Sequence, residues 1–138
     1  MKEPRSRRVF ISFAEPDRTF ARQLQRELER SGLEVWTNEK LQAGDAIRQQ
    51  VEKALRQSEF LVFIVSTRSS ESPNLMFELG AAAAQAKRII PVFRSRRARN
   101  EVPFFTSTLQ SVSAEGKDAA DVAKRIHTEI SQALAAAS

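Results

Sequence analysis

One carboxylate, Glu78, stands out as a candidate for chemistry. It lies in the otherwise apolar segment Asn74–Ala84, where a charged side chain needs either solvent or a partner because burying it unpaired is costly. A placed carboxylate can stabilise a developing positive charge, or it can attack a carbon as a nucleophile. Glu78 also fits an ordinary solvated helix residue, since glutamate favours helices and gains from the helix dipole in an early turn. The residue types alone leave both interpretations open.

Other residue types that commonly carry catalysis are scarce. The chain of 138 residues has no cysteine and a single histidine, His127, which we expect on the surface of the last helix. The lack of cysteine excludes disulfide bridges, thiolate zinc sites and cysteine nucleophiles, and it is typical of a reducing compartment. Since there is no histidine cluster either, we expect no metal site. We also expect no bound cofactor. The absence of cysteine makes a cytoplasmic location the default expectation.

The apolar runs of the chain predict no membrane segment. The longest, Phe60–Val65 and Leu79–Ala84, are far too short to cross a bilayer. The basic start, Met1–Arg8, is not followed by the apolar region of a signal peptide. We therefore expect neither secretion nor membrane insertion.

The positive charge of the chain raises the question of nucleic-acid binding. The formal net charge is +5 and the pI is about 10.2, with arginines clustered at residues 5–8 and 94–99. Neither cluster is interleaved with aromatic residues, and no nucleic-acid motif is present. We interpret the clusters as a solvated tail and a solvated loop, and we do not expect a nucleic-acid partner.

Segments typical of strands alternate along the chain with segments typical of helices. A proline, Pro91, indicates that the fourth strand lies near a sheet edge or a bulge. We expect a basic tail over residues 1–7 and a single domain over residues 8–136. The expected strands are Arg8–Phe13, Leu33–Trp36, Phe60–Ser66, Arg88–Phe93 and Leu109–Ser113. The expected helices are Asp17–Ser31, closed by Gly32; a helix capped by Asp45 with the apolar stripe Ile47, Val51 and Leu55; a helix opened by Pro73; and Asp118–Ala136.

Strict alternation of strands and helices predicts an α/β fold with a parallel sheet covered on both faces. For five strands the flavodoxin-like order 2-1-3-4-5 is the natural arrangement, with the third strand at the centre. In that order the loops after Phe13 and Ser66 flank one crevice at the point where the strand order reverses. Glu78 would lean toward this crevice, with Asn74 one helical turn before it on the same face.

Several ordered motifs resemble those of the TIR domain, the Toll/interleukin-1 receptor module. Val9–Phe13 is similar to the opening strand of that family, and Leu33–Gly44 to its second strand and the following BB loop. Residues Ile47–Ser58 and Phe60–Ser66 match the next two landmarks in order and spacing. The sequence of Glu39–Gly44 is especially similar to that of an NAD-cleaving member of the family.

The resemblance implies an activity and a set of site residues. In the enzymatic branch a glutamate in the helix after the third strand is catalytic, and the matching position is Glu78. NAD+ would be the substrate, and the BB loop, residues 37–45, would mediate self-association. We expect Trp36 to form part of the core or of the cleft wall rather than a platform for base stacking. Ala46 matches a position that contacts the nicotinamide end of the substrate in a relative, where alanine cannot reproduce an aromatic contact. The implied substrate-binding residues are Phe13, Ala14, Trp36, Leu41, Gly44, Ala46 and Asn74.

The chemistry of NAD+ cleavage is compatible with a single carboxylate. Nicotinamide leaves the ribose as a neutral molecule, so it needs no general acid, and the charge that develops is a positive oxocarbenium ion, as in glycoside hydrolysis. The expected function is therefore an NAD+ nucleosidase giving nicotinamide and linear or cyclic ADP-ribose, in bacterial immune signalling or NAD depletion.

Two features keep other functions open. Many catalytic members of the family have a tryptophan one turn ahead of the glutamate, whereas this chain has Asn74-Leu75, and Phe77–Ala81 also resembles nucleoside deoxyribosyltransferases. A non-catalytic interaction module that assembles through the BB loop is a further alternative. A response-regulator receiver is disfavoured because the first strand is not followed by paired acids and the third ends at Ser66-Thr67 without a phospho-accepting aspartate.

Overall fold

The computed structural model describes residues 8–37, 47–67, 88–101 and 111–137. Its strands are β1 (Arg8–Ser12), β2 (Glu34–Thr37), β3 (Phe60–Val65), β4 (Arg88–Phe93) and β5 (Val112–Ser113). Its α-helices are α1 (Arg18–Arg30), α2 (Ile47–Arg56) and α4 (Ala119–Ala137), and two 3₁₀ turns are η2 (Glu15–Asp17) and η5 (Arg96–Glu101). The predicted helix after Pro73 and the cap at Asp45 lie outside the described residues.

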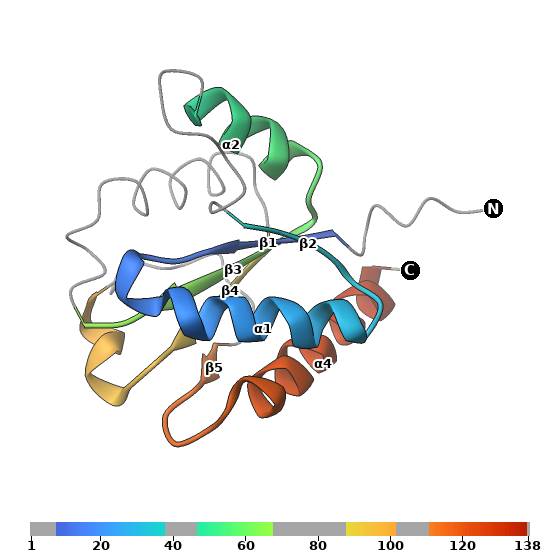
Figure 1. The fold of residues 1–138 in the computed structure, drawn as a ribbon. Helices are drawn as coiled ribbons and strands as arrows, with labels where there is room; N and C mark the ends of the chain where they lie inside the picture. Colours follow the sequence, from blue (N-terminus) through green and yellow to red (C-terminus); the bar gives the residue numbers. More distant parts are fainter. Residues whose placement is uncertain (1–7, 38–46, 68–87, 102–110, 138) are drawn as a thin grey trace.

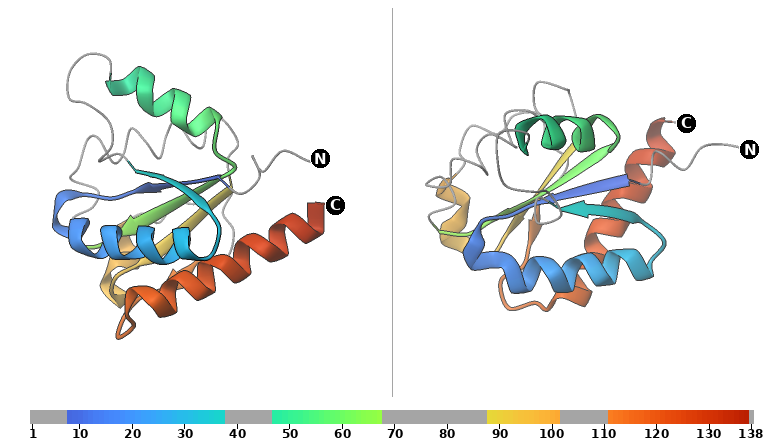
Figure 2. Two further views of the ribbon diagram at one scale, coloured as in Figure 1. Left: turned by 45° about the vertical axis from the view of Figure 1, so that its right-hand side comes forward. Right: turned by 45° about the horizontal axis from the view of Figure 1, so that its top comes forward.

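The strands form one five-stranded sheet in the order β2-β1-β3-β4-β5, and every neighbouring pair is parallel. Helices α1 and α4 lie side by side on one face of the sheet, and α2 covers the other (Figures 1 and 2). The predicted three-layer α/β fold, the strand order and the central place of β3 are all confirmed. No helix in the described ranges combines the length and the apolar character that a bilayer crossing requires.

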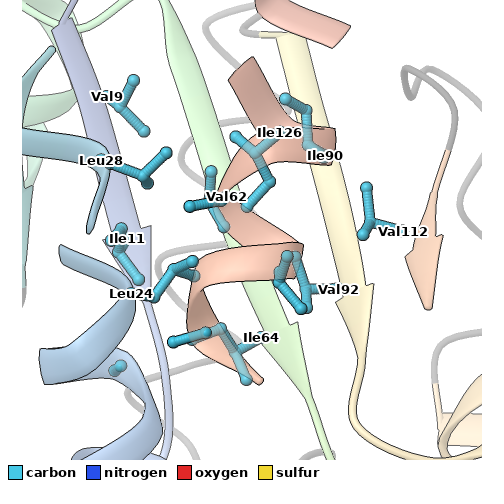
Figure 3. Packing of buried hydrophobic residues seen from close by; sticks show 14 of the residues in the cluster. Val9, Ile11, Leu24, Leu28, Val62, Ile64, Ile90, Val92, Val112 and Ile126 are labelled. Atoms are coloured by element: carbon cyan, nitrogen blue, oxygen red, sulfur yellow. The ribbon is translucent and has the colours of Figure 1, made fainter. Parts of the chain in front are cut away.

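Alternating side chains divide the sheet between two hydrophobic clusters. In β3, which is buried throughout, Val62 and Ile64 face α1 and α4, while Leu61 and Phe63 face α2. The same division holds along the neighbouring strands. Figure 3 shows the larger cluster, in which side chains of α1 and α4 pack on the sheet. A strand buried on both faces reads as a continuous apolar run, which explains why β3 was readily located in the sequence.

Pro91 lies near the edge of the sheet, as its sequence predicts. It pairs in register with Phe63 of β3 on one side. On the other side β5 pairs only Val92 and Phe93, so Pro91 lies outside that short ladder. A missing backbone donor at this position therefore costs no ladder hydrogen bond to β5.

The end of α1 follows the predicted glycine. Gly32 adopts a positive φ of 100°, which side chains disfavour. Its amide donates to the Glu29 carbonyl at 3.0 Å, and the Leu33 amide donates to the Leu28 carbonyl at 3.3 Å. This pair of bonds is a Schellman motif, which satisfies the last carbonyls of the helix and turns the chain into β2.

Candidate functional site

The carboxyl ends of β1, β3 and β4 lie at the same edge of the sheet. Because the three strands are parallel neighbours, with Ser12 in register with Phe63 and Val65 with Phe93, the chain leaves all three at one place. Strand β2 lies on one side of β1 and β3 lies on the other. This edge is therefore the point at which an open α/β sheet usually binds its ligand.

Three of the predicted substrate-binding residues are described, and they divide between the two faces of the sheet. Phe13 is buried in the cluster beneath α1 and α4. Ala14 and Trp36 are partly buried and pack against the cluster on the α2 face. The indole N–H of Trp36 donates to Glu34 at 3.3 Å. The structure thus brings Ala14 and Trp36 to one face and Phe13 to the other, and Trp36 lies at the margin of the core.

The other predicted site residues fall outside the described ranges. They are the proposed catalytic Glu78 and the predicted substrate-binding residues Leu41, Gly44, Ala46 and Asn74. Their roles stay predictions from the sequence.

A polar cluster occupies the edge where the three strands end. Asp17 is 3% exposed and ends the turn η2 that follows β1. Its Oδ2 accepts a hydrogen bond from the Ser66 hydroxyl at 2.8 Å, and its Oδ1 accepts one from the Arg94 guanidinium at 3.0 Å. Ser66 directly follows β3, and Arg94 directly follows β4. One buried carboxylate therefore joins segments from three adjacent strands.

The surroundings of Asp17 act on its charge in opposite directions. Burial raises the pKa of Asp17 above the ordinary 3.8, while the Ser66 hydroxyl and the Arg94 guanidinium lower it without cancelling the rise. The Arg94 guanidinium also lies over the Phe20 ring of α1, 4.3 Å from its centroid. This cation–π contact and the ion pair with Asp17 both restrict the orientation of the Arg94 side chain.

This cluster is not predicted from the sequence. The sequence indicates only the start of a helix at Asp17, the end of a strand at Ser66 and a solvated basic loop at Arg94. The available signal was that a polar residue follows each of three strands predicted to be neighbours. Polar residues after adjacent parallel strands converge on one edge of the sheet, so their association was predictable from the strand order.

A surface groove of about 470 Å³ lies elsewhere, between α1 and α4. It is lined by Glu27, Arg30, Ser31, Ala120, Ala123, Lys124, His127 and Thr128. None of the predicted site residues that the structure describes, Phe13, Ala14 and Trp36, lines it. His127 is exposed there, as expected of a surface residue on the last helix. Within the described ranges, no three acidic or histidine side chains are grouped as a metal site requires.

Comparison with known proteins assigns the family. The family model described as TIR domain matches residues 9–133. This chain belongs to the TIR domain family. The match runs from the second residue of β1 through β5 and includes most of α4.

Two curated relatives of this TIR domain carry names that describe reactions. One, from Acinetobacter baumannii, is named 2' cyclic ADP-D-ribose synthase AbTIR and is 30% identical over 107 residues, which cover 73% of this chain and 39% of the relative. The other, from a Theionarchaea archaeon, is named NAD(+) hydrolase TcpA and is 35% identical over 107 residues, which cover 73% of this chain and 32% of the relative. The matches therefore span well under half of either relative's length.

A solved structure supports the fold of this TIR domain. The RPS4 and RRS1 TIR domain heterodimer superposes with a TM-score of 0.64 at 14% sequence identity, covering 90% of this chain and 95% of that one. At this identity the likeness concerns the fold alone.

Proposed function

We propose that this TIR domain cleaves the bond between nicotinamide and ribose in NAD+, with Glu78 as the catalytic residue. The observation that carries the proposal is the similarity, at 30% and 35% identity, to relatives named as a cyclic ADP-ribose synthase and an NAD+ hydrolase. Family membership over residues 9–133 supports the same assignment. The proposal concerns the domain itself, since the relatives are much longer proteins.

The arrangement of the sheet supports the placement of the reaction. The segment that carries Glu78 follows β3, and the neighbouring strand β1 is followed by Phe13 and then Ala14. Ala14 and Trp36 share the α2 face of the sheet, where they offer apolar surface for a flat ring. A nucleotide bound beside the β1 and β3 ends would lie next to Ala14 and Trp36.

A carboxylate suffices for the chemistry of this cleavage. The bond between the ribose anomeric carbon and the pyridinium nitrogen breaks with both electrons going to nitrogen, so nicotinamide departs neutral. The Glu78 carboxylate stabilises the positive oxocarbenium ion that remains. Attack by water then gives ADP-ribose and one proton, whereas attack by a hydroxyl of the same molecule gives a cyclic ADP-ribose and one proton. Which nucleophile reaches the anomeric carbon decides between hydrolase and cyclase.

The same proposal includes assembly and a cellular role. We infer that copies of the domain associate through the BB loop, residues 37–45, and that association completes the site. The existence of a TIR–TIR heterodimer structure with this fold supports association as a property of such domains. Activity would serve immune signalling or NAD depletion in the cytoplasm of a prokaryotic cell, in keeping with the bacterial and archaeal sources of the relatives.

The test is the release of nicotinamide from NAD+ by wild type and by Glu78→Gln, measured by chromatography with products identified by mass. We expect Glu78→Gln to lower kcat at least 100-fold, the usual loss when the main electrostatic stabilisation of a transition state is removed. Glu29→Gln is the matched control because Glu29 is an exposed glutamate at the far end of α1. Its activity and melting temperature should equal those of wild type.

A concentration series completes this experiment. Specific activity should rise with protein concentration if neighbouring copies complete the site. Undiminished nicotinamide release by Glu78→Gln would remove the catalytic assignment. A wild type that releases no nicotinamide at any concentration would leave a domain whose role is association alone.

A further inference from the structure

Both carboxylate oxygens of Asp17 accept hydrogen bonds from residues that follow other strands. Oδ2 accepts from the hydroxyl of Ser66, the residue after β3, and Oδ1 accepts from Arg94, the residue after β4. The amide of Asp17 itself donates to the Ala14 carbonyl at 2.9 Å, which fixes the turn after β1. The Arg94 amide donates to the Val65 carbonyl at 2.9 Å, which extends the pairing of β3 with β4. The ends of the three strands are thus held as one unit.

Stability alone does not account well for a carboxylate at this position. Asp17 is almost fully buried, and its burial opposes the charged form more strongly than its partners favour it. Buried ion pairs of this kind are often no more stabilising than well-packed apolar side chains of similar volume. What a carboxylate offers, and an apolar side chain does not, is a fixed geometry for two different donors.

Of the two donors, Ser66 is the one on the segment that leads to Glu78. It is the residue with which the chain leaves β3 on its way to Glu78, and it is partly buried. Arg94 is held from the other side by the Phe20 ring of α1, so the carboxylate is braced against the helix layer. Through Asp17 and Arg94, contacts therefore link Ser66 to the turn after β1, to the end of β4 and to α1.

Resting on the function proposed above, we propose that Asp17 is a positioning residue for the reaction at Glu78, because it holds the Ser66 hydroxyl and so fixes the start of the segment that carries the catalytic carboxylate. Asp17 does not act on the substrate. Its effect is geometric, and geometry at this scale is important because a displacement of about 1 Å at a catalytic group can cost ~100-fold in rate.

The experiment compares two serines at opposite ends of the same strand. Ser66 follows β3, whereas Ser58 precedes it, is 2% exposed, and donates its hydroxyl to the Ala54 carbonyl at 2.8 Å. Both Ser66→Ala and Ser58→Ala remove the hydroxyl that donates the bond described, and each is expected to lower the melting temperature. The two variants make the same side-chain change at opposite ends of β3, although Ser66 donates to a carboxylate and Ser58 to a backbone carbonyl.

Steady-state NAD+ cleavage is measured well below the melting temperature of each variant. We expect Ser66→Ala to lower kcat about 10-fold with KM within about 2-fold, since the loss falls on the transition state. Ser66→Thr keeps the hydroxyl and should restore most of kcat. Asp17→Asn retains only one acceptor oxygen for two donors, so it should lower kcat as Ser66→Ala does. Ser58→Ala should keep the kcat of wild type.

The outcomes separate this inference from the function on which it rests. If Glu78→Gln abolishes activity while Ser66→Ala keeps full kcat, the positioning role of Asp17 is overturned and the NAD+-cleaving function stands. Equal losses of kcat in Ser66→Ala and Ser58→Ala would also overturn it, since the effect would then follow stability. If wild type is inactive or Glu78→Gln remains active, the proposed function fails and the positioning role with it. Should Asp17→Asn not fold, the comparison of the two serines decides alone.

Discussion

Replacing Leu24 by alanine should lower the free energy of unfolding by about 3 kcal/mol. Leu24 lies on α1 and is fully buried. It points into the cluster between α1 and the sheet, toward Ile11 of β1 (Figure 3). Truncation removes its apolar contacts and leaves a cavity that the packed strands can fill only in part.

The size of the effect on melting follows from the length of the chain. Unfolding entropy of about 2.1 cal/mol/K per residue gives roughly 0.29 kcal/mol/K for the 138 residues, so a loss of about 3 kcal/mol lowers the melting temperature by about 10 °C. Leu134 on α4 is the matched control, because it is only partly buried against the same cluster. Leu134→Ala should cost about 1 kcal/mol, or about 3 °C.

Both variants are measured by thermal unfolding and by urea denaturation with circular dichroism. Equal slopes in urea for wild type and variants would show that the change lies in stability and not in compactness. A melting temperature of Leu24→Ala equal to that of Leu134→Ala, or above it, would contradict the burial of Leu24. Such a result would mean that α1 does not cover the sheet with the face described.

Two further predictions concern backbone and charge. Gly32→Ala should lower the free energy of unfolding by about 1 kcal/mol, because the φ of 100° disfavours any side chain although nothing lies within 4 Å of the added Cβ; an unchanged melting temperature would contradict this. Because the pKa of Asp17 is raised, the folded protein keeps the carboxyl proton to higher pH than the unfolded chain does. The free energy of unfolding of wild type should therefore fall relative to that of Asp17→Asn as the pH rises from below 3.8 through the folded pKa. The slope is at most ~1.4 kcal/mol per pH unit. Urea denaturation of both proteins between about pH 3 and 7 checks the sign, and a difference that grows in favour of wild type with rising pH would contradict it.

The sequence predicted the fold well because its signals were local. Each strand and helix of the described ranges was expected within a few residues of its bounds, since apolar periodicity and residues such as Gly32 report on their own segment. The start of α1 differed by one residue, because η2 tightens the chain before Arg18. Of the predicted fifth strand Leu109–Ser113, residues 109 and 110 lie outside the described residues, and Val112–Ser113 pairs with β4.

The candidate site was less predictable because it depends on contacts between distant segments. Asp17, Ser66 and Arg94 are separated by long stretches of chain, and nothing in their own neighbourhoods distinguishes them from solvated polar residues. Only the convergence of three strand ends makes one of them a buried acceptor for the other two. Phe13 shows the same limitation: its type fits a stacking ring as well as a core residue, and the side of the sheet on which it falls places it in the core.

The outer strands of the sheet have a consequence for how copies of this domain can gather. In the described part of the chain the two borders are β2, with four residues, and β5, with two. These short border strands offer few backbone amides and carbonyls with which a strand of another molecule could pair. They therefore give little support to fibril growth by strand addition. Over the described residues, contact between copies along these two borders would therefore depend on side chains, which single substitutions can change.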